Sequence, residues 1–189
     1  MRRMRALGLN SVTMYVAWNW HEEEEGQIHG LDAVTGFLDA AKSTGMLVIL
    51  RPGPYICGEW EMGGLPAWML LKTGADGLKL RTYEPQYIAA VDRWWSALLA
   101  AVAPYTYSRG GPICVTQIEN EYGSFGSCDT NPADAKYMNH LLSLASSHLG
   151  APMTEMLYTT IDVSEHAPFA SSLEAQRRGC TGRRGQERR

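Results

Sequence analysis

The chain has 189 residues, 45% of them hydrophobic, so it is long enough for one domain with a buried core. It is shorter than the roughly 250 residues of a complete eight-stranded β/α barrel. Its net charge of −3 gives no sign of a nucleic-acid partner, and it contains no run of about 20 apolar residues that would span a membrane.

The first predicted element is a strand over residues 10 to 18, where polar and apolar residues alternate and β-branched and aromatic types are common. An acidic run from Glu22 to Glu25 follows it. We interpret that run as a solvated loop rather than a metal site, because no second histidine follows His21 at helical spacing.

A helix is predicted over residues 32 to 43, because apolar residues recur there at helical spacing and Gly45 is placed to end the helix. The continuous apolar run from Met46 to Leu50 then predicts a strand buried on both faces. Together with the first strand, these elements form a βαβ unit.

Residues 51 to 83 are rich in glycine, proline and tryptophan and make a long connection, which favours a functional loop. Glu84-Pro85 opens a second helix, because proline suits the first helical position. The predicted buried face of this helix consists of Ile88, Val91, Trp95, Leu98 and Val102.

The stretch from Gly110 to Gly123 carries polar side chains at the end of an apolar strand. Gln117, Glu119 and Glu121 share one parity, so a regular strand would point all three to the same side. A glutamate at a strand end is usually solvated, but polar groups stacked beside an apolar strand are costly unless they are paired or used. A buried carboxyl group with a raised pKa suits general acid catalysis, and glycoside hydrolysis uses two carboxyl groups. The strand therefore predicts one half of a catalytic pair.

A third helix is predicted after Asn131-Pro132, and Gly150 follows its end. Its predicted apolar face consists of Met138, Leu141, Leu142, Ala145 and Leu149. Residues 156 to 160 form a further predicted strand. Because strands and helices alternate, the sequence predicts a parallel sheet with right-handed crossovers.

Four tryptophans lie near predicted strand ends and have two interpretations. They form an aromatic platform for the face of a sugar, or they cap the apolar core of the domain. The four are Trp18, Trp20, Trp60 and Trp68.

Three sequence blocks, which begin at Gly8, Arg51 and Gly110, resemble glycoside hydrolase family 35, the β-galactosidases. The third block contains Gly-Gly-Pro-Ile and then Gln117 and Glu-Asn-Glu-Tyr-Gly. The resemblance covers roughly residues 4 to 162 and implies an α/β fold, a partial TIM (β/α)8 barrel of about four strand-helix units. We therefore expect an incomplete barrel domain over residues 1–170, without the first strand and the last three strands.

The resemblance also implies roles for individual residues. In the family the second glutamate of Glu-Asn-Glu is the proton donor, which corresponds to Glu121. Asn120 matches the amide that holds the sugar 2-hydroxyl. Tyr15, Gly58 and Glu59 match positions that contact galactose, and Gly58 stands where alanine is usual.

Glu119 fits better as a structural carboxylate than as the catalytic acid. The family's nucleophile is a glutamate on the seventh strand, beyond the end of the resemblance. We therefore expect a fragment of a retaining exo-β-galactosidase that hydrolyses terminal β-D-galactose residues, inactive and marginally stable by itself. Two alternatives stay open: a sugar-binding remnant without catalytic activity, and an interaction module that uses the Arg-rich end of the chain.

Residues 171–189 hold six arginines and almost nothing apolar, which predicts a disordered tail. A basic interaction arm is the alternative. Because the resemblance stops before this segment, we hypothesise that the tail is an artefact of the gene model.

The four cysteines show no metal-finger spacing. Cys57 and Cys114 lie in apolar contexts that predict buried free thiols, whereas Cys128 lies in a loop and could join a disulfide in a secreted form. The expected ligand is a β-galactoside, and no metal or organic cofactor is implied. The resemblance suggests a lysosomal, vacuolar or secreted protein, although no signal peptide is visible.

Overall fold

The computed structural model describes residues 1–73, 77–126 and 130–162. The predicted tail, the domain boundary at residue 170 and the predicted role of Cys128 lie outside these ranges.

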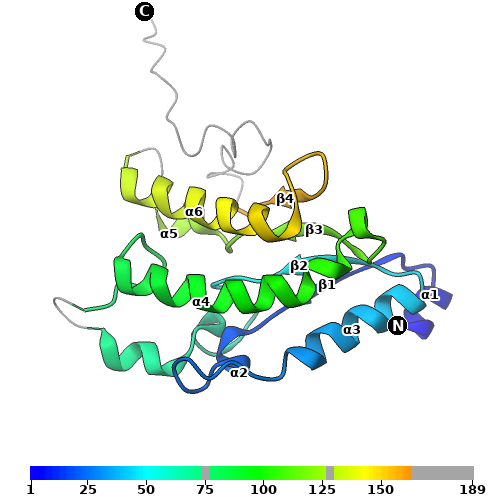
Figure 1. Cartoon of the computed structure of the whole chain (residues 1–189), viewed down its shortest axis with the longest axis horizontal. Helices are drawn as coiled ribbons and strands as arrows, with labels where there is room; N and C mark the ends of the chain where they lie inside the picture. Colours follow the sequence, from blue (N-terminus) through cyan, green and yellow to red (C-terminus); the bar gives the residue numbers. More distant parts are fainter. Residues whose placement is uncertain (74–76, 127–129, 163–189) are drawn as a thin grey trace, which may run out of the picture.

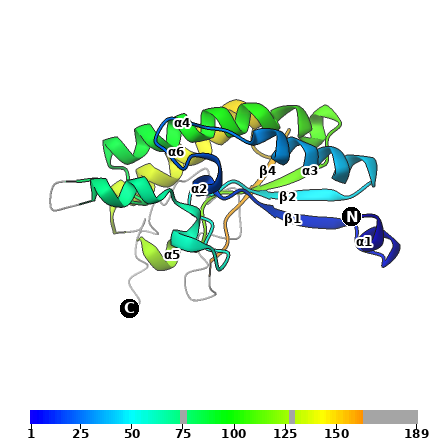
Figure 2. The same ribbon diagram turned by 90° about the horizontal axis from the view of Figure 1, so that it is seen from below.

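A parallel sheet of four strands forms one layer of the described part of the chain (Figure 1). The strands lie side by side in chain order: β1 (Ser11–Tyr15), β2 (Leu47–Arg51), β3 (Ile113–Gln117) and β4 (Leu157–Thr159). Figure 2 shows that the helices between consecutive strands all lie on one face of the sheet. They are α3 (Leu31–Ser43), α4 (Pro85–Val102) and α6 (Pro132–Leu149). The predicted alternation of strands and helices in a partial β/α barrel is confirmed.

The helix boundaries follow the signals in the sequence. At the start of α4, the Glu84 side chain accepts from the backbone nitrogens of Gln86 and Tyr87 at 3.1 and 2.9 Å. This satisfies two of the backbone donors that a helix leaves free at its first turn. Asn131 caps α6 by accepting from one backbone nitrogen, that of Ala133, at 3.1 Å. All five residues predicted for the buried face of α4 are buried, and α3 is followed by Gly45 in the left-handed region, with φ 66°.

The two faces of the sheet differ in what covers them. The register aligns Met14, Leu50, Thr116 and Tyr158 in one row across the four strands, and all four are buried on the helix side. The next row, on the opposite face, consists of Thr13, Ile49, Val115 and Leu157. Leu157 is 45% exposed, because none of the described helices covers this face. In a closed β/α barrel this face would be the interior.

The prediction that the strand after Gly45 is buried on both faces is therefore wrong. Val48 and Leu50 are fully buried under the helices, but Leu47 is 37% exposed on the other face. The apolar run matches a strand that is buried on both sides in a complete barrel, whereas the described residues cover only one side.

The acidic run after β1 was predicted to be solvated, and this prediction is wrong for Glu22. Glu22 is fully buried and accepts from Nε1 of Trp18 and from Nη2 of Arg93, both at 2.6 Å. Trp18 in turn stacks on Trp94 of α4, with ring centroids 5.9 Å apart. Glu22 therefore ties the segment after β1 to α4, while Glu23 to Glu25 are exposed as predicted.

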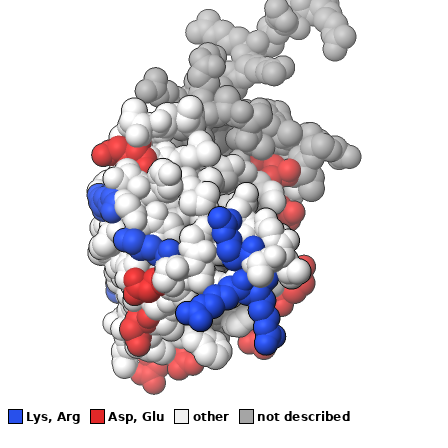
Figure 3. Space-filling view, turned by 90° about the vertical axis from the view of Figure 1, so that its right-hand side faces the viewer, with Lys and Arg blue, Asp and Glu red and all other residues white. Residues whose placement is uncertain are grey.

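Shorter elements occupy both ends of the sheet. No pattern in the sequence predicted α1 (Arg2–Ala6), whose three arginines are exposed. Figure 3 shows Lys and Arg side chains gathered on the side where α1 lies. Within the described ranges, no helix is long and apolar enough to cross a membrane. The remaining short helices are α2 (Trp18–His21), η1 (Glu61–Gly64), η2 (Ala67–Lys72), η3 (Ala103–Tyr105), η4 (Tyr107–Arg109) and α5 (Tyr122–Phe125).

Candidate active site

The carboxyl ends of all four strands meet at one edge of the sheet. Tyr15 pairs with Arg51 at the ends of β1 and β2, and Gln117 pairs with Thr159 at the ends of β3 and β4. The loops that follow the strands leave from this same edge, which is where β/α barrels place their reactive side chains. Most of the residues predicted for a site lie on these loops or strand ends.

Glu119 is buried in a closed network just beyond β3. It is 1% exposed and pairs with Arg81 through both carboxylate oxygens, at 3.1 Å from Nε and 2.8 Å from Nη2. The Tyr137 hydroxyl donates to Oε1 at 3.0 Å, and the backbone nitrogen of Asn120 donates to Oε2 at 2.7 Å. All of these donors favour an ionised carboxylate, so Glu119 acts as an anchor within the protein.

Arg81 lies between aromatic rings as well as against the carboxylate. Its guanidinium carbon is 4.0 Å from the ring centroid of Tyr55 and 4.2 Å from that of Phe125. Nη2 also donates to the backbone oxygen of Asn120 at 2.7 Å. One arginine from the loop after β2 therefore fixes both the side chain of Glu119 and the backbone that follows it.

Burial dominates the electrostatics of this network. Burial raises the pKa of the Glu119 carboxyl, while Arg81 and the hydrogen bonds from Asn120 and Tyr137 act in the opposite direction. Burial is the largest single influence on Arg81 and acts to lower its pKa, but the charge of Glu119, the hydrogen bonds to it and the nearby Tyr137 and Tyr87 together raise the pKa. The pKa of the Tyr137 hydroxyl is also raised, first by burial and then by the Glu119 charge.

The prediction that Gln117, Glu119 and Glu121 point to one side is wrong. The regular strand ends at Gln117, and Glu119 and Glu121 both have left-handed backbone, with φ 58° and 49°. This conformation is uncommon outside glycine and is held here by backbone hydrogen bonds, among them Glu121 N to Ile161 O at 2.9 Å. As a result Glu119 is buried and Glu121 is exposed.

Arg51 links Tyr15 to Asn120. Asn120 is 5% exposed, and its Oδ1 accepts from Nη2 of Arg51. Nη1 of Arg51 donates to the Tyr15 hydroxyl, and the guanidinium carbon lies 4.2 Å from the centroid of the Tyr15 ring. Two residues predicted to contact galactose, from β1 and from beyond β3, are therefore brought together.

The loop after β2 places Gly58 and Glu59 next to this group. Cys57, Gly58 and Glu59 are consecutive residues with positive φ, at 56°, 58° and 51°. A Cβ at Gly58 would lie 3.4 Å from Cε1 of Tyr15, so the loop backbone passes directly against that ring. Glu59 is exposed. Cys57 and Cys114 are free thiols but only half-buried, which corrects the prediction that both are buried.

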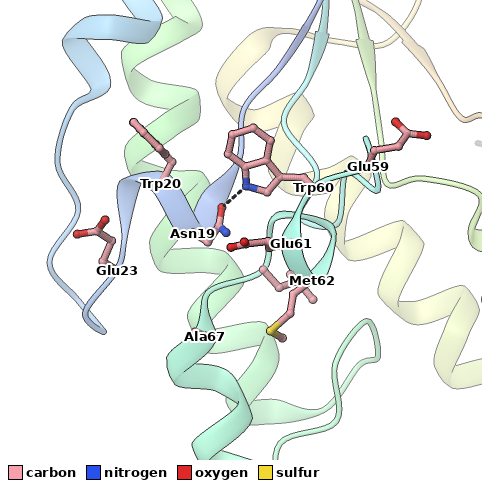
Figure 4. Close-up of a pocket in the computed structure, with 9 residues that line it drawn as sticks. Asn19, Trp20, Glu23, Glu59, Trp60, Glu61, Met62 and Ala67 are labelled. Carbon is pink, nitrogen blue, oxygen red and sulfur yellow. Dashed lines mark hydrogen bonds between the residues drawn. The ribbon is translucent and has the colours of Figure 1, made fainter.

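The four tryptophans divide between the core and the surface. Trp18 is fully buried, and Trp68 packs against the core and donates to the backbone oxygen of Glu22 at 3.1 Å, as the core interpretation requires. Trp20 is 64% exposed and Trp60 is 45% exposed. These two rings meet edge to face at 6.3 Å beside an open cavity of about 670 Å³, where Nε1 of Trp60 donates to Asn19 (Figure 4). A sugar-stacking role for this pair stays a prediction.

Sequence reasoning missed two of the residues that organise the site. Arg51 directly follows an apolar run, which is the same signal that drew attention to Glu119, so it could have been found. Arg81 lies in the long connection between β2 and α4 with no local pattern around it, and only its contacts identify it. Among the described residues, no group of three or more His, Cys, Asp or Glu side chains is placed to hold a metal ion.

Comparison with known proteins places this site in context. Residues 1–183 match the family model described as glycosyl hydrolases family 35. The match extends past residue 162, where we expected the resemblance to end, so the end of the resemblance no longer supports a gene-model artefact. The chain is 46% identical over 165 residues to a beta-galactosidase of Canis lupus familiaris, covering 86% of this chain and 23% of the relative. It is also 46% identical over 160 residues to beta-galactosidase 17 of Arabidopsis thaliana, covering 84% and 22%.

Solved structures agree on the fold. An exo-beta-1,4-mannosidase from Opitutaceae bacterium strain TAV5 superimposes with a TM-score of 0.61 at 19% identity, covering 83% of this chain and 26% of that one. A GH5_18 structure from Streptomyces cattleya in complex with GlcNAc gives a TM-score of 0.61 at 20% identity, covering 84% and 36%. These similarities support the partial β/α barrel. The chain spans 22–28% of the length of the curated relatives it matches.

Proposed function

This chain belongs to family 35 of the glycosyl hydrolases, and from that premise we propose that it carries the acid/base side of a retaining β-galactosidase active site. The substrate class is a terminal, non-reducing β-D-galactose residue. Glu121 is the proton donor, and Tyr15, Gly58, Glu59 and Asn120 bind the sugar.

The observation that carries this proposal is the contrast between two neighbouring carboxylates. Glu119 is occupied by Arg81, Tyr137 and the Asn120 backbone, so no acceptor position is left for a substrate. Glu121 is exposed, and its carboxylate makes no hydrogen bond within the described residues. Of these two carboxylates, Glu121 is therefore the one that is free to approach a glycosidic oxygen.

The neighbours of Glu121 suit the binding of a sugar. Asn120 precedes it and is rigidly held, so its amide can form a bond to the 2-hydroxyl that strengthens at the transition state. Tyr15 and the Gly58 loop form an adjoining wall, and Glu59 offers acceptor oxygens to further hydroxyl groups. The amide, the phenol and the carboxylate supply both donors and acceptors, as a polyol requires.

A retaining mechanism also needs a nucleophilic carboxylate about 5–5.5 Å from the acid. In the family this is a glutamate on the seventh strand of the barrel, and the structure describes four strands. Glu121 would protonate the leaving oxygen as that nucleophile attacks, and would then take a proton from water as the covalent intermediate is hydrolysed.

A second candidate is a sugar-binding remnant without catalysis. The contacts of Arg51 favour it, because they bring Tyr15 and Asn120 together for sugar binding without any contribution from a nucleophile. Supplying the rest of the barrel distinguishes the two, in a hybrid where this chain replaces the matched segment of a beta-galactosidase relative. Galactose binding without release of a chromogenic aglycone by the hybrid supports the remnant, whereas turnover that is abolished by Glu121→Gln supports the catalytic role.

The role of Glu121 is tested in a hybrid enzyme in which this chain replaces the matched segment of the Canis lupus familiaris relative. Removing an acid slows substrates with poor leaving groups more than those with good ones, because only the former need protonation. Glu121→Gln is expected to slow the glycosylation step far more for an alkyl galactoside than for a dinitrophenyl galactoside. An equal loss on both substrates would refute the assignment.

A further inference from the structure

Arg51 ends β2 and lies between Tyr15 and Asn120, two of the residues proposed to bind galactose. Its Nη1 donates to the Tyr15 hydroxyl and its Nη2 to Oδ1 of Asn120. The guanidinium also covers the face of the Tyr15 ring at 4.2 Å. A single side chain from β2 therefore holds side chains that come from β1 and from beyond β3.

The chemistry of arginine fixes the direction of both hydrogen bonds. A guanidinium only donates, so Tyr15 and Asn120 must each accept at the atom that faces it. When Oδ1 of Asn120 is turned toward Arg51, the NH2 group of the same amide is turned elsewhere. The Tyr15 hydroxyl, which accepts from Arg51, keeps its own proton for another partner.

Without the guanidinium, nothing would set the direction of these hydrogen bonds. The two orientations of an asparagine amide differ by a half-turn and have nearly the same shape, so only the surrounding donors and acceptors select one of them. The backbone of Asn120 is already held by Arg81 and Glu119. Arg51 contributes what those contacts do not, which is the orientation of the side-chain amide.

The local cost of Arg51 points to a role beyond packing. Its Nε is buried and makes no hydrogen bond within the described residues. A buried donor without a partner destabilises the folded state, and an aliphatic side chain in this position would avoid that cost. The two hydrogen bonds to Tyr15 and Asn120 are therefore made at the cost of one buried donor without a partner.

We infer that Arg51 is a positioning residue that sets Tyr15 and Asn120 as hydrogen-bond donors toward the sugar. The inference rests on the proposed function for the identity of the ligand. Under it, the Asn120 amide donates to the oxygen of the 2-hydroxyl, and the Tyr15 hydroxyl donates to a second sugar oxygen. The site thereby recognises oxygen acceptors on galactose at two points that are joined through one guanidinium.

The orientation of the Asn120 amide is measured directly by NMR of the whole chain. The Nδ2 resonances are assigned by their absence in Asn120→Asp. Arg51→Met is expected to shift them, and Arg51→Lys, which keeps the charge and a single donor nitrogen, to reverse part of that shift. Arg109→Met is the matched control, because Arg109 is an exposed arginine that donates to backbone oxygens far from this edge of the sheet.

Binding provides the second measurement, with galactose and 2-deoxygalactose as probes. Arg51→Met is expected to weaken galactose binding about tenfold, the effect of losing one hydrogen bond. The preference for galactose over 2-deoxygalactose is expected to disappear in the same variant. Should Arg51→Met fail to fold, as circular dichroism would reveal, Arg51→Leu, which also carries no donor, takes its place with the same expected results.

The outcomes separate this inference from the proposed function. Nδ2 resonances of Asn120 that do not move when Arg51 is replaced would overturn the inference, whatever the binding data show. A chain that binds no galactose would count against the proposed function, while the NMR result would still decide the role of Arg51. Weakened galactose binding with the preference over 2-deoxygalactose intact would also overturn it, since that pattern reflects a general structural effect.

Discussion

Replacing Arg81 with methionine tests whether Glu119 is anchored as its contacts indicate. The substitution keeps an apolar stem between Tyr55 and Phe125 but removes the bidentate partner of a carboxylate that is 1% exposed. Removing one partner of a buried ion pair costs about 3–5 kcal/mol, because the remaining charge is left without compensation. For a domain of this size each kcal/mol lowers the melting temperature by about 2–4 °C.

The pH dependence of this loss is a sharper signature. Burial already raises the pKa of Glu119 in the folded chain above its unfolded value of about 4.3. Protonation of Glu119 therefore stabilises the folded chain. This stabilisation is fully present below the unfolded pKa and is lost as the pH rises through the folded pKa. Without Arg81 the folded pKa rises further, and the carboxyl is neutral over a wider pH range. Arg81→Met is therefore expected to be less destabilised at pH 5 than at pH 8.

Urea unfolding followed by tryptophan fluorescence measures both quantities. Arg109→Met serves as the control, because Arg109 is exposed and its loss is expected to have little effect at either pH. A loss below about 1 kcal/mol for Arg81→Met, in the range of a surface pair, would refute the buried anchor. An equal loss at both pH values would refute the electrostatic explanation.

Three further changes are expected to affect stability, each measured by the same urea titration. Glu84→Ala removes the cap of α4 and is expected to cost about 0.5–2 kcal/mol, and no measurable cost would contradict the capping contacts. Gly111→Ala places a Cβ 2.0 Å from the backbone oxygen of Tyr105 and is expected to cost about 1–3 kcal/mol or to prevent folding. A neutral result would show that the backbones of Gly111 and Tyr105 do not approach so closely. Leu50→Ala is expected to cost about 2–5 kcal/mol and Leu47→Ala less than half as much, since of the two residues only Leu50 is covered by helices. Similar losses for the two variants would mean that both faces of the sheet are covered.

The sequence was sufficient for the parts of the fold that depend on local periodicity. All five residues predicted for the buried face of α4 are buried, because Ile88 to Val102 repeat at helical spacing and Glu84-Pro85 marks the first turn. The helix also buries four residues that were not predicted: Tyr87, Ala90, Trp94 and Leu99. The strand after Gly45 was located correctly, but the exposure of Leu47 was not foreseen. An apolar run indicates that a strand is suited to burial on both faces. It does not indicate whether other elements cover both faces.

The site was predicted less well, because its geometry depends on backbone conformation and on distant partners. Parity assumed that the strand continued to Glu121, yet left-handed residues begin directly after Ile118 and turn the two glutamates apart. Arg81 approaches Glu119 from 38 positions away, and no spacing rule connects them. The assignment of Glu119 as structural came from the family motif, and its burial supports that assignment.

The central claim is that Glu121, and not Glu119, is the acid and base of the site. It is tested most directly in the hybrid enzyme by adding azide to the Glu121→Gln variant during hydrolysis of dinitrophenyl β-galactoside. An enzyme that has lost only its acid/base residue accepts azide as the nucleophile in the second step without base assistance. The account predicts faster turnover with azide and β-galactosyl azide as the product. No acceleration and no azide product, or the same response from Glu119→Gln, would contradict it.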